Sequence, residues 1–154
     1  VMAASPAHLE GYQVLHGLVS HKTAFTPAER TVVWMAINVE HGCHYCVPAH
    51  TTIAQMEKID AALIDELRAG GTLSDPKLEA LRRFTLAVLR ARGRVDAAEL
   101  EAFKAAGFGD AHVLDVVLIL AQKVMSNYVN HLYDTPVDAP FQKNAWTPTA
   151  TAAE

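Results

Sequence analysis

Helix start signals recur along the chain and constrain its fold more than any other feature. The segment Thr26-Pro27-Ala28-Glu29 has the form of a capping box with proline at the first helical position. Asp60, Asp75, Asp96 and Asp110 are each placed to accept hydrogen bonds at the start of a further helix. Signals for β-strands are almost absent. The chain is therefore predicted to be all-α.

The same signals divide the chain into about seven helices joined by short connections. The expected helices cover residues 8–21, 27–41, 43–58, 60–70, 78–92, 97–106 and 111–133. Pro48 is tolerated only near the start of a helix, so the helix that contains it is expected to begin close to Cys43. Prolines interrupt residues 135–154, which we expect to form an extended tail. We predict one compact helical domain over residues 1–154.

The composition of the 154 residues favours a globular protein, because 51% are hydrophobic and 19% are charged. The net charge is −4, and the 13 basic residues are scattered without a run. This argues against nucleic acid or an anionic membrane as a main partner. The most apolar stretch, residues 113–125, is too short to cross a bilayer and contains Asp115 and Lys123. The first residues lack the layout of a signal peptide, so a cytoplasmic location is expected.

The two cysteines of the chain form one CxxC, Cys43 and Cys46, and His50 follows four residues later. On a helix, spacings of three, four and seven place these three side chains on one face. Two sulfurs one turn apart can form a disulfide, and a histidine one turn further can exchange protons with the nearer sulfur. Without a secretion signal, this spacing indicates redox or metal chemistry rather than a structural disulfide.

Two arguments rank the cysteines in opposite order. The start of a helix stabilises a thiolate through its free N–H groups and its dipole, which favours Cys43 as the more acidic thiol. The position of His50 favours Cys46 instead, because the imidazole lies one turn past that sulfur. We follow the histidine and predict that Cys46 attacks a peroxide and that Cys43 resolves the product into a disulfide.

Two other uses of the cysteines are open at this point. Cys43, Cys46 and His50 offer three zinc ligands, and His41 or His44 could supply the fourth. One contiguous helix cannot easily surround a tetrahedral metal, and the chain has no second CxxC, so we expect neither a metal nor a cofactor. Buried, inert cysteines are the other alternative.

The predicted long helix over residues 111–133 is apolar on nearly all sides of its first three turns. A helix that is apolar all round is buried all round. In a small domain a subunit interface can bury it, so we expect a homo-oligomer. Asn127, Tyr128 and His131 share part of one face of this helix and could line a pocket near the cysteines, but we favour ordinary helix packing and surface positions for them.

Residues 40–50, Glu-His-Gly-Cys-His-Tyr-Cys-Val-Pro-Ala-His, resemble the signature of the carboxymuconolactone decarboxylase superfamily in its AhpD-like alkylhydroperoxidase branch. That pattern reads approximately N-G-C-x-Y-C-x-x-x-H. The resemblance covers residues 26–60 specifically and 111–133 loosely. It implies an all-helical fold, assembly as trimers or hexamers, and reduction of organic hydroperoxides through a redox-active disulfide. It also implies a dithiol reductant such as a lipoylated protein.

Carried over position by position, the resemblance matches Cys46 to the attacking cysteine, Cys43 to the resolving cysteine and His50 to the relay histidine. Two other relay positions differ. The glutamate of the family pattern, twelve residues before the first cysteine, is Thr31 here, and a further histidine is Tyr45. A threonine hydroxyl cannot act as a general base near neutral pH. The dithiol itself is intact.

Glu29 and Glu40 do not replace the missing glutamate, because both lie about half a turn away from the face of Thr31. The sequence thus predicts a thiol-dependent peroxidase or dithiol oxidoreductase. One alternative is a non-catalytic oligomer that senses redox state or binds a small molecule. Another is a lactone decarboxylase, although the decarboxylating members of the superfamily generally lack the CxxC.

Overall fold

The computed structural model describes residues 1–148, and within them the chain is entirely helical, as predicted. It contains the α-helices α1 (Pro6–Lys22), α2 (Pro27–Glu40), α3 (Cys46–Met56), α4 (Ala61–Ala69), α5 (Pro76–Arg90), α6 (Ala97–Ala105) and α7 (Asp110–Leu132), and the 3-10 helices η1 (Met2–Ala4) and η2 (Ala139–Asn144). In this part of the chain, none of the helices has the length and hydropathy that a bilayer crossing requires.

The predicted caps explain where most helices begin. At α2 the Thr26 side chain accepts from the Glu29 N–H, and the Glu29 carboxylate accepts from the Thr26 N–H. Asp60, Asp75 and Asp96 cap α4, α5 and α6 in the same way. Each cap satisfies backbone donors that the first turn of a helix leaves unpaired.

The prediction that Asp110 caps α7 is wrong. Asp110 is the first residue of the helix, and Gly109 stands at the cap position. The Gly109 N–H donates to Nδ1 of His112 at 3.0 Å, while the Asp110 carboxylate pairs with Lys104 at 2.8 Å. His112, the third residue of α7, therefore plays the part that Glu29 plays at α2, where a side chain accepts from the N–H of the cap residue.

The helix with the CxxC is expected to begin around Cys43, and α3 begins three residues later, at Cys46, so that the CxxC lies at its N-terminal end. Gly42, with φ of +61°, ends α2, and a turn connects the two helices. The N–H of Cys43 donates to the Asn38 carbonyl at 3.0 Å, which keeps Cys43 in this turn. The CxxC therefore spans the junction, with only its second cysteine in the helix.

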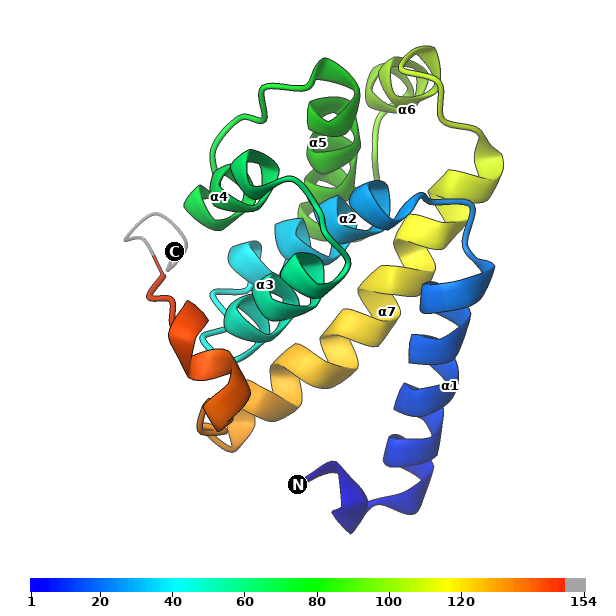
Figure 1. Cartoon of the computed structure of the whole chain (residues 1–154). Helices are drawn as coiled ribbons and strands as arrows, with labels where there is room; N and C mark the ends of the chain where they lie inside the picture. Colours follow the sequence, from blue (N-terminus) through cyan, green and yellow to red (C-terminus); the bar gives the residue numbers. More distant parts are fainter. Residues whose placement is uncertain (149–154) are drawn as a thin grey trace.

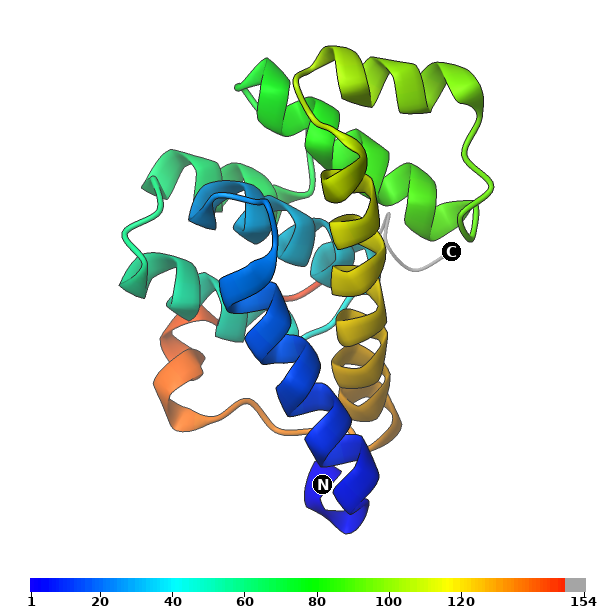
Figure 2. The ribbon, with the colours of Figure 1, turned by 90° about the vertical axis from the view of Figure 1, so that its right-hand side faces the viewer.

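Helix α2 forms the centre of the fold and packs against α3, α4, α5 and α7 (Figure 1). Its middle is buried on every side, and Trp34 is its largest buried side chain. Helix α1 runs beside α7, as Figures 1 and 2 both show. At the other end of the core, the ring of Phe103 stacks between those of Phe84 and Phe108, with centroid distances of 4.1 and 4.6 Å.

The expectation that α7 is buried on all sides does not hold for the isolated chain. Val116 and Ile119 are fully buried, but Leu114 is 70% and Val117 50% exposed. In the C-terminal half of α7, the buried face is polar. That face carries the buried side chains of Gln122, Lys123, Ser126, Asn127 and Asn130.

The expected extended tail instead folds back across α3, as the orange and red segment in Figure 1 shows. Asn144 in η2 donates to the Thr52 hydroxyl at 2.8 Å, and Arg68 donates to the carbonyls of Asn144 and Ala145 at 3.1 Å each. Trp146 then donates from Nε1 to the Arg68 carbonyl at 3.0 Å. These contacts give the proline-rich segment a fixed position beside the cysteines. Residues 149–154 of the predicted tail lie outside the residues that the structure describes.

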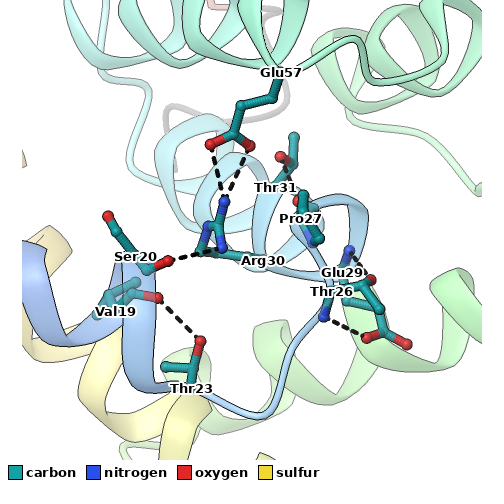
Figure 3. A network of polar contacts seen from close by, with 9 residues as sticks. All are labelled: Val19, Ser20, Thr23, Thr26, Pro27, Glu29, Arg30, Thr31 and Glu57. Carbon is teal, nitrogen blue, oxygen red and sulfur yellow. Dashed lines mark hydrogen bonds and ion pairs between the residues drawn. The ribbon is translucent and has the colours of Figure 1, made fainter.

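A polar network fixes α3 against α1 and α2 (Figure 3). The Arg30 guanidinium donates to both carboxylate oxygens of Glu57, at 2.9 and 3.0 Å, and to the Ser20 carbonyl at 3.2 Å. Glu57 follows the last residue of α3, so the pair anchors the C-terminal end of that helix. Its N-terminal end carries the cysteines.

Candidate active site

Helix α3 and the turn before it bring the two sulfurs together. The Sγ atoms of Cys43 and Cys46 lie 2.6 Å apart, with the Cys43 thiol donating to Cys46. The backbone N–H of Cys46 donates to the Cys43 sulfur at 3.3 Å. Both cysteines are free thiols and almost completely buried. Formation of a disulfide therefore requires little backbone movement.

The Cys46 sulfur is the more acidic of the two. The hydrogen bond from the Cys43 thiol, the charge of Lys123 and the Asn130 amide at 3.3 Å together lower the pKa of Cys46 to about 6. The bond to Cys46 and burial raise the pKa of Cys43. This order is the reverse of the one that helix position alone predicted, because Cys43, Lys123 and Asn130 all stabilise the thiolate of Cys46. It agrees with the order inferred from the histidine, although the catalytic roles of the cysteines stay a prediction.

His50 lies one turn into α3 and is 7% exposed. Within residues 1–148 it makes no hydrogen bond to either sulfur, in contrast to the direct proton exchange expected from the spacing. Its Nε2 lies 2.8 Å from the Nζ of Lys123, and its ring packs 4.8 Å from that of Trp34, centroid to centroid. Burial, and then the charge of Lys123, lower the pKa of His50 well below its ordinary value. The imidazole is therefore neutral.

Lys123 is the residue of this site that the sequence reasoning missed. Its side chain comes from α7 and is 1% exposed. Burial lowers the pKa of this ammonium. A signal was present in the sequence, because residues 122, 123, 126, 127 and 130 are polar and recur at helical spacing within an otherwise apolar helix. That stripe faces α2 and α3 and supplies both Lys123 and Asn130.

Trp34 links the histidine to the rest of this stripe. Its Nε1 donates to the Gln122 side chain at 2.8 Å, and the Gln122 amide lies 3.3 Å from Nδ1 of His16. The indole is thus held on both sides, by a hydrogen bond and by the His50 ring. This buried network fixes the position of the His50 imidazole beside the cysteines.

A cavity of about 450 Å³ opens onto the Cys46 sulfur, His50 and Lys123. Most of its other walls are apolar or aromatic. They include Met2, Tyr12, Ala49, Ile53, Val129 and Phe141.

The candidate pocket residues of α7 do not line this cavity. Asn127 is buried but donates toward Nδ1 of His41 at 3.0 Å, and Tyr128 and His131 are exposed. The wall is formed instead by Ser126, Val129 and Asn130, which face inward. Asn127, Tyr128 and His131 thus take packing and surface positions, the alternative that the sequence favoured.

No family model matches the chain, and no curated protein matches it. Solved structures do match. An uncharacterised peroxidase-related protein from Silicibacter sp. TM1040 superposes with a TM-score of 0.79 at 19% identity, over 91% of this chain and 75% of that chain. An alkylhydroperoxidase AhpD core protein from Ralstonia eutropha JMP134, also described as peroxidase-related, has a TM-score of 0.78 at 27% identity, over 91% of this chain and 76% of that chain.

A third match is a protein of unknown function from Agrobacterium tumefaciens, for which the antioxidant defence protein AhpD is given as a candidate identity. It has a TM-score of 0.72 at 14% identity and covers 89% of this chain and 94% of that chain. The fold is AhpD-like. The resemblance inferred from residues 40–50 therefore extends over nine tenths of the chain at the level of structure.

The two positions at which the sequence differs from the pattern that it resembles, Thr31 and Tyr45, have other partners in the structure. The hydroxyl of Thr31 donates to the Pro27 carbonyl at 2.9 Å, within its own helix (Figure 3). Tyr45 donates to the Asp138 carboxylate at 2.6 Å. Glu29 and Glu40 pair with Lys77 and Arg90, so neither replaces the family's glutamate. The distances of these two ion pairs are 2.7 and 2.6 Å.

The two extra histidines proposed as zinc ligands bind elsewhere. His41 contacts Asn127, and Nε2 of His44 lies 3.1 Å from the Thr135 carbonyl. Across residues 1–148, the structure contains no cluster of three or more histidine, cysteine or acidic side chains that could hold a metal ion. Within this part of the chain, Cys43, Cys46 and His50 therefore do not form a cluster of that kind.

Proposed function

We propose that this AhpD-like protein is a thiol-dependent peroxidase that reduces organic hydroperoxides with the Cys43–Cys46 pair. One observation carries the proposal. The acidic sulfur of Cys46 lies 2.6 Å from a second thiol and at the wall of a cavity that is open to solvent on one side. A thiolate at neutral pH, a resolving thiol and space for a substrate are the three requirements of this chemistry.

The proposed cycle begins when the Cys46 thiolate attacks the outer oxygen of the hydroperoxide and breaks the O–O bond. That oxygen stays on Cys46 as a sulfenic acid, and the alkoxide leaves and takes up a proton. The Cys43 sulfur then attacks the Cys46 sulfenic acid, which forms the S–S bond and releases water. A dithiol finally reduces the disulfide and returns both thiols.

The cavity favours an organic hydroperoxide over hydrogen peroxide. A volume of about 450 Å³ lies within the usual range for small-molecule sites. Ile53, Val129 and Phe141 would bury an alkyl or aryl group of the substrate while its peroxide reaches Cys46. Hydrogen peroxide would leave most of this apolar volume unfilled.

The burial of the sulfurs also restricts the reductant. Cys46 is 2% and Cys43 0% exposed, so a rigid cysteine on the surface of a folded protein could not reach them. A small dithiol, or the long flexible arm of a lipoylated protein, could enter through the cavity. We place this activity in the cytoplasm.

We further propose that the protein works as a homo-oligomer, a trimer or hexamer as the family resemblance implies. The apolar side chains of Leu114 and Val117 on the outer face of α7 support this, together with the exposed Val14 and Leu18 of the neighbouring α1. Burying this surface against further copies of the chain would remove it from water.

Intact mass spectrometry of the reduced protein tests the peroxidase proposal. One equivalent of cumene hydroperoxide should remove two hydrogens from the wild type. In Cys43→Ser the mass should instead increase by one oxygen, because the Cys46 sulfenic acid has no resolving thiol. Cys46→Ser should not react. Unchanged mass of the wild type, with both thiols still open to alkylation, would contradict the proposal.

Catalytic turnover separates a peroxidase from the alternatives. With excess dihydrolipoamide, a peroxidase consumes many equivalents of hydroperoxide, whereas a redox sensor reacts once and stops. A lactone-handling enzyme would keep its full activity when both Cys43 and Cys46 are replaced by serine. The proposal predicts turnover in the wild type and complete loss in that double variant.

A further inference from the structure

Lys123 is a buried cation without a buried carboxylate. Its Nζ is covered by protein, and its one hydrogen-bond partner is Nε2 of His50 at 2.8 Å. Among residues 1–148, no Asp or Glu oxygen lies within ion-pair distance of it. The titratable and charged groups that influence the site come from α1, α2 and α3 and from the turn before α3. They are Tyr12, His16, Arg30, His41, Cys43, His44, Tyr45, Cys46 and His50.

The thiolate of Cys46 is therefore the only anion of this set near neutral pH. A buried ammonium without a counter-charge is strongly disfavoured. Lys123 and Cys46 line the same cavity, and each stabilises the charged form of the other. When Cys46 becomes part of a disulfide, its negative charge disappears. Lys123 then remains as an isolated buried cation, which is an unstable arrangement.

The hydrogen bond also defines the tautomer of His50. A lysine ammonium can only donate, so Nε2 of the neutral imidazole must accept, and the ring proton is on Nδ1. That Nδ1 is buried and has no partner within residues 1–148. His50 also lines the cavity. Within the described residues, the Nδ1–H group of His50 is therefore a hydrogen-bond donor without an acceptor.

We infer that Lys123 supplies, through His50, the proton that the leaving alkoxide takes up when Cys46 attacks the peroxide. This inference rests on the proposed function and assigns a route for its proton. His50 gives its Nδ1 proton to the alkoxide and receives one from Lys123 at Nε2. Lys123 is thus a positioning residue that acts through His50, and it takes the place of the glutamate that Thr31 replaces.

The protons balance over the complete oxidation. The reduced site holds the Cys46 thiolate, the Cys43 thiol and the Lys123 ammonium. The hydroperoxide becomes an alcohol with the proton of Lys123. The second oxygen leaves as water, formed with the Cys43 proton and the hydrogen that the hydroperoxide brought. The oxidised site holds a disulfide and a neutral amine. No proton enters from solvent, and the dithiol later returns one hydrogen to Cys43 and one proton to Lys123.

This balance gives a direct test. The reduced protein is mixed with tert-butyl hydroperoxide in weakly buffered solution, and a pH indicator counts the protons taken up per disulfide formed. At about pH 9, where the Cys46 thiol is ionised, the wild type and the control Lys22→Met should take up close to zero. Lys22 is exposed at the end of α1. Lys123→Met, which keeps the volume of the side chain without its charge, should take up one proton once Cys46 is ionised.

Rates provide the second readout. At a pH where Cys46 is ionised in every variant, oxidation by the hydroperoxide should be about 100-fold slower in Lys123→Met and in His50→Gln, as expected for loss of a general acid. His50→Gln can still accept from Lys123 but cannot pass a proton on. It should therefore keep the low alkylation midpoint of Cys46, whereas Lys123→Met should raise it.

Two results would overturn the inference: uptake of one proton by the wild type, or equal oxidation rates in Lys123→Met and the wild type. A third experiment separates this inference from the peroxidase proposal. Diamide oxidises dithiols without a peroxide and needs two hydrogens to become its hydrazine. If the wild type does not react with hydroperoxides, the peroxidase proposal fails. In that case the diamide reaction alone tests whether Lys123 loses its proton when the disulfide forms. We expect no proton uptake in the wild type and uptake of one proton in Lys123→Met.

Discussion

The amide of Asn130 is the contact to the Cys46 sulfur whose removal gives the clearest prediction. Its Nδ2 lies 3.3 Å from Sγ, and the side chain is 7% exposed. Asn130→Leu keeps the approximate volume and removes the donor. A hydrogen bond to a charged group contributes about 1.5–3 kcal/mol, and one pKa unit corresponds to about 1.4 kcal/mol. Since the contact is long, we expect the lower end, a rise of about one unit.

The variant should therefore shift the pKa of Cys46 from about 6 to about 7. At about pH 6.5 the thiolate fraction falls from about three quarters to about one quarter, a threefold loss. A thiolate of higher pKa is also more nucleophilic, by about threefold for one unit. These two effects cancel near that pH. A rate at a single pH is thus uninformative, and the midpoint of the pH profile must be measured.

Alkylation by iodoacetamide, followed by mass spectrometry of the peptide with Cys46, gives that midpoint. Asn127→Leu is the matched control, since it removes another buried amide of α7 that contacts His41 and not a sulfur. Its midpoint should equal that of the wild type, and circular dichroism establishes that each variant is folded. An unchanged midpoint in Asn130→Leu, or an equal shift in Asn127→Leu, would refute this account of the thiolate.

Three further predictions concern stability and assembly. Thr26→Ala removes the cap of α2 and should lower the free energy of unfolding by about 1 kcal/mol, which lowers the melting temperature by about 2–4 °C. Thr26→Ser keeps the cap and should melt like the wild type. Equal melting temperatures of all three proteins would contradict the role of the cap. Phe103→Ala opens the aromatic stack and should cost about 3–5 kcal/mol in urea unfolding, against under about 1.5 for Phe103→Leu. A loss below about 1 kcal/mol in the alanine variant would mean that the stack contributes little. Leu114→Lys places a charge on the exposed apolar face of α7 and should reduce the mass measured by light scattering, and a wild-type monomer would refute the proposed interface.

Local signals predicted the helices well because helix caps act over only a few residues. The Thr26 capping box and the aspartates at 60, 75 and 96 work as the sequence indicated. Prediction failed where a more distant group competed with the local one. Asp110 pairs with Lys104 and lies inside α7, while Gly109 takes the cap position and donates its N–H to His112. The tail packs on α3 because Arg68 and Thr52, far away in sequence, bind its backbone and side chains.

The candidate site divides in the same way. Cys43, Cys46 and His50 could be selected because their spacing is a local pattern. The partners of these residues could not, since Lys123 and Asn130 lie more than 70 residues later in the chain. Spacing suggested that His50 acts directly on Cys46, whereas the structure gives its hydrogen bond to Lys123.

The sequence by itself determined the helical class, the position of the dithiol near a helix start and the absence of the family's glutamate at Thr31, because each depends on residue identity and short spacing. Only the tertiary structure decided which sulfur is the acidic one and which residue forms a hydrogen bond with His50. The pKa of Cys46 and the partner of His50 depend on burial and on charges from α7, and packing alone brings that helix against α3. Electrostatic interactions act through space, so a one-dimensional pattern does not contain them.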